Sequence, residues 1–450
     1  MSDLENKKEL TPEERRKIRK KQELRRKRRR KRRIYMGILA GMIVIALILL
    51  VILVKIVAGI VTDHKESQKT GQGAVSAEST EAVEASDTET ETAAAAEETV
   101  TKANDGNIHL IMAGDIVLHD DLERLSARSD GTYDYTDLFK NVTDKVQSAD
   151  LALINAETII GGSELKVSGF PNFNASYELA DAIADCGFNV VLSANNHAND
   201  KGEQGILNCL ENWKRFPDIE VLGIHDSKED AEEIYVYEQD GMKIAILNYT
   251  LPLNKSIESS SKSYLIDRME EKRVRSDIQK AHELADFVIV CPHWGTECRF
   301  YIDDNQKKWA QIFLEEGVDL VLGTHTHVIG KIQTLTDEDT GHEMLVYYAL
   351  GNFCGYISET GLNVQYRTIG SMAEVTIGKK EDGSVGILDY GIEPLICHIS
   401  KEQDLATVIP YEYYTESLAE EHLAKLYTGK YSLEFIEGIL DDNWGDLWRQ

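Results

Sequence analysis

Two histidines one residue apart, His325 and His327, follow a short apolar run that ends at Gly323. The run from Val318 to Leu322 has the composition of a buried strand. A strand that stops at a glycine and is followed by two imidazoles can hold a metal ion at the carboxyl edge of a sheet. Because paired histidines are also common in solvated loops, the metal hypothesis requires that other segments bring ligands to the same place.

Four other apolar runs end in a similar way. Each is followed by oxygen or nitrogen ligands, in chain order Asp115, Glu157, Asn196 with His197, and His293. Carboxylate, amide and imidazole groups together suit Mn, Fe or Zn, and not Ca or a thiolate site. Six or seven such groups predict two divalent metal ions that share a bridging carboxylate.

Each of these residues also has an interpretation without a metal. Asp115 could cap a helix, and Glu157 could be a surface charge. The asparagine pair at 195–196 could form a turn, and His293 could be a core histidine bonded to the backbone. The metal hypothesis is favoured because five independent caps and turns would rarely all carry metal-binding side chains.

The elements that must position these residues follow from the hydrophobic pattern. Short apolar runs alternate with amphipathic segments from residue 107, which predicts an α/β domain over residues 107–400. We expect strands at 108–113, 151–155, 190–193, 243–248, 287–291, 319–322, 345–350, 371–378 and 386–399. We expect helices at 175–185, 205–216, 268–284 and 306–316, and a helical extension over 401–450 with segments 416–427 and 433–448. No internal repeat, P-loop or GxGxxG motif is present.

The N-terminal quarter has a different composition. Residues 1–33 carry 17 Lys and Arg against six acids, and residues 36–54 are a run of 19 without a charge. A helix of that length spans about 28 Å, close to the hydrocarbon core of a bilayer. The basic flank predicts a cytoplasmic tail (1–33), an uncleaved signal anchor (34–61) and an extracytoplasmic remainder. A nuclear-targeting or RNA-binding tract and a cleaved signal peptide are the alternatives.

Residues 62–106 contain neither aromatic residues nor proline, and they predict a disordered acidic linker. Beyond residue 61 the chain has 31 Lys and Arg against 71 Asp and Glu, which excludes a nucleic-acid-binding surface of the usual basic kind. The six cysteines form no CxxC or zinc-ribbon spacing, and one or two disulfides stay open.

The ordered set of motifs over residues 107 to about 355 resembles the poly-γ-glutamate synthesis (CapA-type) family, which is related to the calcineurin-like metallophosphoesterases. The matching pieces are Gly114-Asp115, Asn155-Ala156-Glu157, Asn195-Asn196-His197, His293-Trp294-Gly295-x-Glu297, Gly323-x-His325-x-His327 and Gly351-Asn352-Phe353. As an ordered set these motifs are specific, whereas singly none is.

The resemblance implies a layered α/β/β/α metallophosphoesterase-like sandwich with a dinuclear metal site. It assigns ligand roles to Asp115, Glu157, Asn196, His293, His325 and His327, with Glu157 as the bridge. It further implies that His197 is the general acid near the leaving group and that Asp200 orients it.

The sequence departs from the family pattern at several positions. Val117 stands where metallophosphoesterases usually have an imidazole, and His119 stands where the family has arginine. Ala156, Thr326 and Cys298 replace a leucine, a proline and a tyrosine. The resemblance therefore predicts either a weaker first metal site or the recruitment of His119. From the residues alone, His119 and Asp120 could line the site or cap the next helix.

Two classes of function follow. The first is a membrane-anchored, extracytoplasmic hydrolase or transferase of poly-γ-glutamate or capsule biosynthesis, or a phosphatase or phosphodiesterase of the cell envelope. The second is a non-catalytic scaffold for export of an anionic polymer. Ligation of glutamate by ATP needs a nucleotide site that this sequence lacks, so both classes imply other membrane proteins of a polymer synthase as partners.

Overall fold

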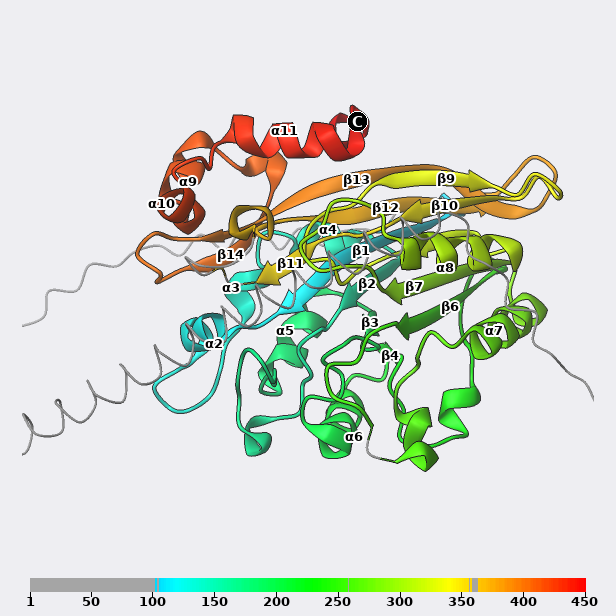
Figure 1. The fold of residues 1–450 in the computed structure, drawn as a ribbon, viewed down its shortest axis with the longest axis horizontal. Coiled ribbons are helices and arrows are strands. Elements are labelled where there is room, and N and C mark those ends of the chain that lie inside the picture. The colour runs from blue at the N-terminus through cyan, green and yellow to red at the C-terminus, as the bar shows by residue number, and fades with distance from the viewer. Residues whose placement is uncertain (1–101, 103–104, 258, 356, 358–362) are drawn as a thin grey trace, which may run out of the picture. The chain divides into compact units, whose positions relative to one another are not determined.

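Two mixed β-sheets lie at the centre of the structure, with helices packed against them (Figure 1). The computed structural model describes residues 102, 105–257, 259–355, 357 and 363–450. The predicted cytoplasmic tail and membrane anchor, and all of the predicted linker except residues 102, 105 and 106, lie outside the described residues. Among the helices of the described part, none combines the length and the apolar composition that crossing a bilayer requires.

The first sheet has the strand order β14-β13-β12-β1-β2-β3-β4, and β11 also pairs with β1. Strands β1 to β4 run parallel, while β12, β13 and β14 pair antiparallel. Its strands are β1 (Ile108–Val117), β2 (Leu151–Asn155), β3 (Val190–Leu192), β4 (Glu220–Leu222), β11 (Asn352–Gly355), β12 (Ile369–Lys379), β13 (Val385–Ile399) and β14 (Ala406–Pro410).

The second sheet has the order β5-β6-β7-β8-β10-β9. Strands β6, β7, β8 and β10 are parallel, and β5 and β9 pair antiparallel at the two edges. Its strands are β5 (Tyr235–Gln239), β6 (Met242–Thr250), β7 (Phe287–His293), β8 (Leu320–Leu322), β9 (Ile332–Thr336) and β10 (Glu343–Tyr347).

Helices connect the strands. The α-helices are α2 (Asp120–Ser126), α3 (Thr136–Phe139), α4 (Thr143–Ser148), α5 (Glu178–Cys186), α6 (Gly202–Trp213), α7 (Glu271–Leu284), α8 (Asp304–Glu315), α9 (Glu416–Glu421), α10 (Leu423–Thr428) and α11 (Leu433–Trp444). Short 3₁₀ helices cover Ser163–Leu165, Asp230–Glu232, Ser260–Leu265, Val364–Tyr366, Tyr411–Tyr413 and Leu447–Arg449.

Alternation along β6 shows how the layers are built. Ile244 and Ile246 are buried in the core that the two sheets share. Ala245 and Leu247 point to the opposite face, into a second core with residues of α7 and α8. Because neighbouring side chains of a strand point to opposite faces, this pattern places the second sheet between the first sheet and these two helices. Helices α3 and α4 contact β14 and β12 of the first sheet.

The first strand is longer than we predicted. The prediction ended at residue 113, whereas β1 continues to Val117 because β11 pairs with its last residues, Asp115 opposite Asn352. The predicted strand at 345–350 corresponds to β10, which ends at Tyr347, and β11 is a separate strand that we did not predict. The sequence analysis did not predict the edge strands β4, β5 and β9.

The C-terminal segment 401–450 is not helical throughout. Strand β14 pairs with β13, so the first sheet continues past residue 400. The predicted helix at 416–427 is interrupted at His422, whose backbone is extended and whose Nδ1 accepts a hydrogen bond from the Ala424 amide at 2.9 Å. Residues of this segment belong to the same compact unit as the rest of the described chain.

The six cysteines are buried and unpaired.

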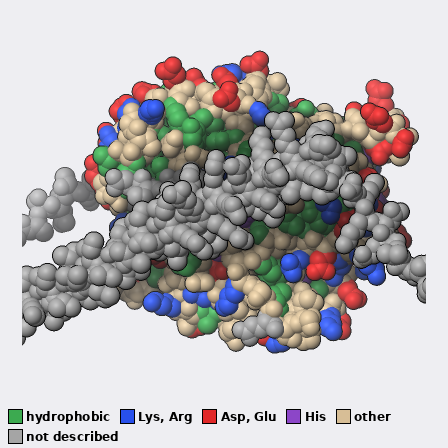
Figure 2. Space-filling model, viewed as in Figure 1, with side chains coloured by type: hydrophobic (Ala, Val, Ile, Leu, Met, Phe, Trp, Pro, Cys, Tyr) green, Lys and Arg blue, Asp and Glu red, His purple; other side chains and the backbone are tan. Residues whose placement is uncertain are grey.

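Charges are unevenly distributed on the face shown in Figure 2, where Asp and Glu lie mainly along the upper and right-hand margins and Lys and Arg gather more in the lower part. The local field at a given place on the surface therefore differs from what the net charge alone suggests.

Candidate metal centre

Asp115 lies within β1 at a shift in strand register, not after the end of a strand as the sequence suggested. The backbones of β1 and the turn before β11 approach so closely that a Cβ on Gly114 would stand 2.0 Å from the Gly351 oxygen. Glycine is therefore required beside the aspartate. Asp115 is fully buried, its Oδ1 accepts a hydrogen bond from Asn155 Nδ2 at 2.6 Å, and its Oδ2 accepts one from the His325 amide at 3.2 Å.

Glu157 follows β2 and is also fully buried. Neither of its carboxylate oxygens has a hydrogen-bond partner within the described residues. Oε1 lies 3.8 Å from His293 Nε2, and Oε2 lies 3.8 Å from His327 Nδ1. The two oxygens of one carboxylate thus face two different imidazoles.

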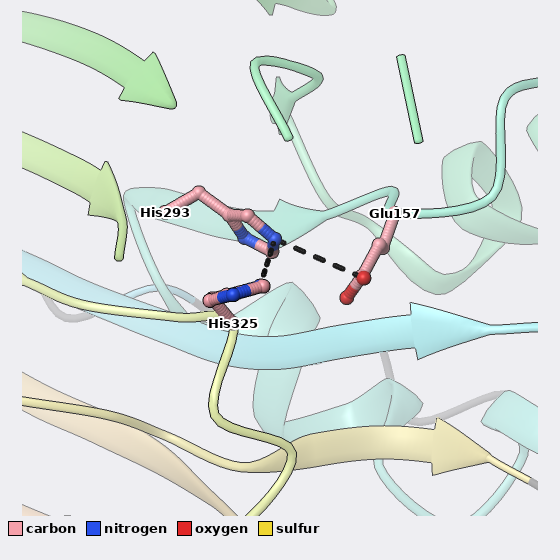
Figure 3. Close-up of side chains that lie close together, drawn as sticks. All are labelled: Glu157, His293 and His325. Carbon is pink, nitrogen blue, oxygen red and sulfur yellow. Dashed lines mark hydrogen bonds and ion pairs between the residues drawn. The ribbon is translucent and has the colours of Figure 1, made fainter. Parts of the chain in front are cut away.

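The first group of candidate ligands consists of Glu157, His293 and His325. Their side chains point toward one another (Figure 3). His293 Nε2 lies 3.0 Å from His325 Nδ1 and 2.7 Å from Asn196 Oδ1. Ligand atoms that surround one ion at about 2.0–2.2 Å stand about 3 Å apart, close to the distances of His293 Nε2 from His325 and Asn196, whereas Glu157 Oε1 lies farther from it, at 3.8 Å. Thr324 Oγ1, at 2.9 Å from Nδ1 of His293, orients this ring so that Nε2 faces the other ligands.

The second group consists of Asp115, Glu157 and His327. His327 Nδ1 lies 3.7 Å from Asp115 Oδ2, and 3.0 Å from the side-chain oxygen of Asn352. The two groups share only Glu157. All predicted ligands are therefore brought together in one place, which we call the metal centre: Asp115, Glu157, Asn196, His293, His325 and His327.

The loop after β8 adopts an unusual backbone to present its histidines. His325 has φ +95° and His327 has φ +58°, conformations that cost an L-residue about 1–3 kcal/mol. Just before them, a Cβ on Gly323 would stand 2.4 Å from the Tyr348 oxygen, so glycine is needed for the loop to leave the sheet here. Such strain concentrates where a function requires a particular side-chain direction.

Burial controls the electrostatics of the metal centre. It raises the pKa of Asp115 to about 7 and, with the neighbouring Asp115 as the next cause, raises the pKa of Glu157 well above its usual value. Burial also lowers the pKa of His293 well below normal, that of His325 to about 4 and that of His327 to about 3. Neutral imidazoles are the form that binds metal, and nearby cations would restore both carboxylates to the charged form.

The unpartnered atoms test whether metal ions fit. Glu157 Oε1 and Oε2, Asn155 Oδ1 and Asn196 Nδ2 are buried without hydrogen-bond partners in the described part of the chain. A buried carboxylate with no partner is strongly destabilising. Two divalent cations would satisfy the carboxylate oxygens, and the mixture of carboxylate, amide and imidazole suits Mn, Fe or Zn.

His197 and Asp200 form a pair beside the metal centre. His197 Nδ1 lies 2.6 Å from Asp200 Oδ2, which also accepts a hydrogen bond from the Phe173 amide at 2.7 Å. The other ring nitrogen of His197 lies 3.9 Å from Glu157 Oε1 and 3.1 Å from Asn254 Nδ2. Asp200 thereby fixes the ring so that Nε2 faces the metal centre.

A cleft of about 400 Å³ opens onto this edge of the molecule. Its lining includes the His197–Asp200 pair and His327 from the metal centre, together with His119, Phe173, Lys255 and Arg367. A molecule placed in the cleft would therefore contact this pair and the metal centre at the same time.

His119 lines the cleft but belongs to neither ligand group. Its ring meets Phe173 edge-on at 5.3 Å, and its Nδ1 lies 3.3 Å from the Val117 oxygen. Asp120 is a structural residue, because its Oδ1 accepts a hydrogen bond from the Gly169 amide at 2.6 Å. Within the described residues, His119 lies outside both groups, and its recruitment to a metal stays a prediction.

Sequence reasoning assigned no role to four supporting residues. Asn155 and Asn352 stand in motifs that we quoted, and they contact Asp115 and His327. Thr324 and Asn254 gave no signal of their own. The position of Thr324 directly before the predicted ligand His325 is the one clue to its role, whereas Asn254 reaches His197 only through the tertiary fold.

The sequence model of the family described as "Bacterial capsule synthesis protein PGA_cap" matches residues 109–356, more than half of the chain. The chain therefore belongs to the bacterial PGA_cap capsule synthesis family.

Two relatives are named for this process. The chain is 27% identical over 224 residues to the PGA biosynthesis protein CapA of Bacillus subtilis (strain 168). The matched region covers 46% of this chain and 57% of that protein. It is 24% identical over 252 residues to the capsule biosynthesis protein CapA of Bacillus anthracis, covering 54% and 59%. The chain thus spans less than two thirds of the length of either relative.

Among solved structures, the NAD nucleotidase NadN of Haemophilus influenzae matches with a TM-score of 0.39 and 13% identity, over 65% of this chain and 58% of that one. A similarity at this level carries no argument about function.

Proposed function

We propose that this protein is a membrane-anchored, extracytoplasmic hydrolase of poly-γ-glutamate or capsule biosynthesis that uses two divalent metal ions. The observation that carries the proposal is the position of Glu157. Its two buried oxygens face two separate groups of ligands and have no partner in the described part of the chain. A carboxylate that bridges two cations is the arrangement that would account for this geometry.

Two divalent cations bound here would polarise the scissile group and lower the pKa of a water molecule near it. Asp115, Glu157 and His327 would hold one cation, while Glu157, Asn196, His293 and His325 would hold the other. An attacking water molecule would lose one proton to the solvent as its oxygen bonds to the carbonyl carbon or phosphorus, and the bond to the leaving nitrogen or oxygen would break. His197 Nε2 would donate a proton to the leaving atom, and Asp200 would keep the ring aligned for this transfer.

The location of the protein is inferred from sequence. The basic tract at 1–33 next to the uncharged run at 36–54 favours a single membrane-spanning anchor with the N-terminus in the cytoplasm. The described residues would then lie outside the membrane. Because no nucleotide motif is present in the sequence, polymerisation would depend on other membrane proteins of the synthase.

The names of the relatives favour a γ-glutamyl polymer as substrate, and hydrolysis at a γ-glutamyl amide is the reaction we favour. A phosphoester of the cell envelope is the alternative, since two cations and a proton donor would serve that reaction equally well.

The test uses the full-length chain purified in detergent, freed of metal and then supplied with Mn²⁺ or Zn²⁺. It is assayed on poly-γ-glutamate and on the phosphodiester bis(p-nitrophenyl) phosphate. We expect metal-dependent cleavage of one of these, reduced at least about a hundredfold in Glu157→Gln. A wild-type protein inactive on both, together with normal polymer production in cells carrying Glu157→Gln, would favour the scaffold function instead.

A further inference from the structure

Arg367 is a cation of the cleft without a protein counter-ion among the described residues. It follows the 3₁₀ helix Val364–Tyr366, precedes β12 and lines the cleft. Its Nε is buried and has no hydrogen-bond partner within the described residues. The chain has 77 Asp and Glu against 49 Lys and Arg, so a carboxylate partner for a cleft guanidinium would be easy to supply. A partly buried guanidinium without one indicates that the cleft binds an anionic ligand.

The backbone of Arg367 is tied to the metal centre. Its carbonyl oxygen accepts a hydrogen bond from Asn352 Nδ2 at 3.0 Å, and the side-chain oxygen of Asn352 lies 3.0 Å from His327 Nδ1. The guanidinium charge also reaches the cleft wall: burial first and Arg367 second lower the pKa of His119 to about 4. Arg367 thus stands on the His327 side of the cleft.

Lys255 supplies a second cation on the side of His197. It is exposed, lines the cleft and follows Asn254, whose Nδ2 lies 3.1 Å from His197 Nε2. Its Nζ donates one long hydrogen bond of 3.5 Å to the backbone carbonyl oxygen of Asp200. This contact does not neutralise the charge of the ammonium group. Glu297 also lines the cleft and is exposed, yet within the described residues it forms an ion pair with neither cation.

We propose that Arg367 and Lys255 bind an anionic group, a carboxylate or a phosphate, that the substrate carries next to the bond to be cleaved. This inference rests on the proposed function and specifies its substrate class. The guanidinium offers the paired donors that fit a carboxylate or phosphate in two-point contact, and the ammonium acts as a second point charge. The two cations offset, inside the cleft, the repulsion that the acidic chain exerts on an anionic substrate.

A binding experiment tests this without depending on turnover. The full-length chain in detergent, loaded with Mn²⁺, is titrated by calorimetry with three probes: tri-γ-glutamate, the same peptide with its α-carboxylates converted to amides, and p-nitrophenyl phosphate. We expect the wild type to bind tri-γ-glutamate at least about tenfold more tightly than the amide, and Arg367→Gln to abolish that difference. If phosphate is the true anion, the loss in Arg367→Gln falls on p-nitrophenyl phosphate instead.

Conservative and control variants sharpen the test. Arg367→Lys should retain part of the discrimination, because it keeps the charge and loses the planar fork. Lys255→Gln, at an exposed position, should weaken binding less than Arg367→Gln. The matched control is Arg299→Gln, which removes an exposed arginine that does not line the cleft and should leave all affinities unchanged. Metal content and thermal stability of each variant show that it is folded.

The outcomes separate this inference from the proposed function. Arg367-dependent binding without any hydrolysis would refute the hydrolase and leave the anion site standing. If Arg367→Gln and Lys255→Gln both hydrolyse the substrate and bind the probes as tightly as the wild type, the anion site is refuted and the hydrolase function stands. Failure of the wild type to bind either anionic probe would also overturn the inference.

Discussion

Two buried groups of histidines in the described part of the chain differ in one respect. The metal centre at the edge of the two sheets contains carboxylate and amide atoms without partners among the described residues. A second group, which we call the structural cluster, lies where the C-terminal helices meet β13. It comprises His398, Tyr414, His422 and Tyr431.

Partners are present throughout the structural cluster. His398 Nδ1 lies 3.0 Å from the Tyr414 hydroxyl, and His422 Nε2 lies 3.0 Å from the Cys397 oxygen. The Tyr431 hydroxyl lies 2.8 Å from Thr368 Oγ1. Burial lowers the pKa of His398 to about 4 and that of His422 to about 3, as it does in the metal centre.

Buried histidines with lowered pKa values therefore do not by themselves mark a functional site. The distinguishing feature is the unsatisfied polar atom, above all the Glu157 carboxylate. The structural cluster should contribute to stability, whereas the metal centre should contribute little to stability until cations bind.

The largest expected effect is the loss of activity in His293→Ala. This substitution removes the ring that contacts both Asn196 and His325, so we expect metal loss and a decrease in activity of at least about a thousandfold. Stability in the presence of a chelator should change little. Elemental analysis measures the metal content, kinetic assays measure the activity, and melting curves recorded with a chelator measure the stability. A variant that keeps its metal and activity would show that His293 is not a ligand of the centre.

The reverse behaviour is expected in the structural cluster. His422→Ala leaves the Ala424 amide and the Cys397 oxygen without partners and opens a cavity, so the free energy of unfolding should fall by about 2–4 kcal/mol. Metal content should equal that of the wild type. Urea unfolding and elemental analysis provide the check; metal loss in His422→Ala would mean that the two clusters are not functionally distinct.

A smaller effect is expected when the proton donor is misaligned. Asp200→Asn removes the carboxylate from His197 Nδ1 without touching the two ligand groups. We expect kcat to fall about tenfold to a hundredfold, with KM and metal content near wild type. An altered pH profile of kcat would identify the positioning role, whereas a proportional loss of metal and activity would contradict it.

The smallest effect is a difference in pH dependence. His422 is buried with a pKa of about 3, while in the unfolded chain a histidine takes up its proton near pH 6.5. Between pH 6.5 and about 3 the unfolded state therefore binds more protons, and stability falls as the pH is lowered. In the presence of a chelator, the decrease in the free energy of unfolding between pH 7.5 and pH 5 should be up to about 2 kcal/mol smaller in His422→Gln than in wild type. Equal losses in urea titrations would show that His422 does not control this dependence.

The sequence was sufficient to predict which residues meet in the metal centre. Strands β1, β2, β3, β7 and β8 are parallel within their sheets, so residues at or beyond their carboxyl ends collect at the same edges. An apolar run followed by a ligand is a local pattern, and each instance could be recognised without knowledge of the pairing. The roles of His197 and Asp200 came from the family resemblance and stay predictions.

Features that depend on contacts between distant segments could not be predicted. The pairing of β11 with β1 extends the first strand past Asp115, and nothing near residue 113 indicates this. The break at His422 depends on the Cys397 oxygen, 25 residues away in the chain. Arg367 and Lys255 likewise gave no signal, since their position in the cleft is a consequence of the tertiary fold.

Metal stoichiometry in Glu157→Gln tests the central claim most directly. The full-length chain and its variant are equilibrated with Mn²⁺, and bound metal per chain is counted by elemental analysis, with Glu123→Gln as the matched control. Glu123 is also a buried glutamate and its Oε1 lacks a partner among the described residues, but its Oε2 accepts a hydrogen bond from the Tyr135 hydroxyl at 2.6 Å. We predict about two ions in the wild type and in Glu123→Gln, and about one or none in Glu157→Gln. Two ions in Glu157→Gln, or none in the wild type, would contradict a bridging carboxylate at this position.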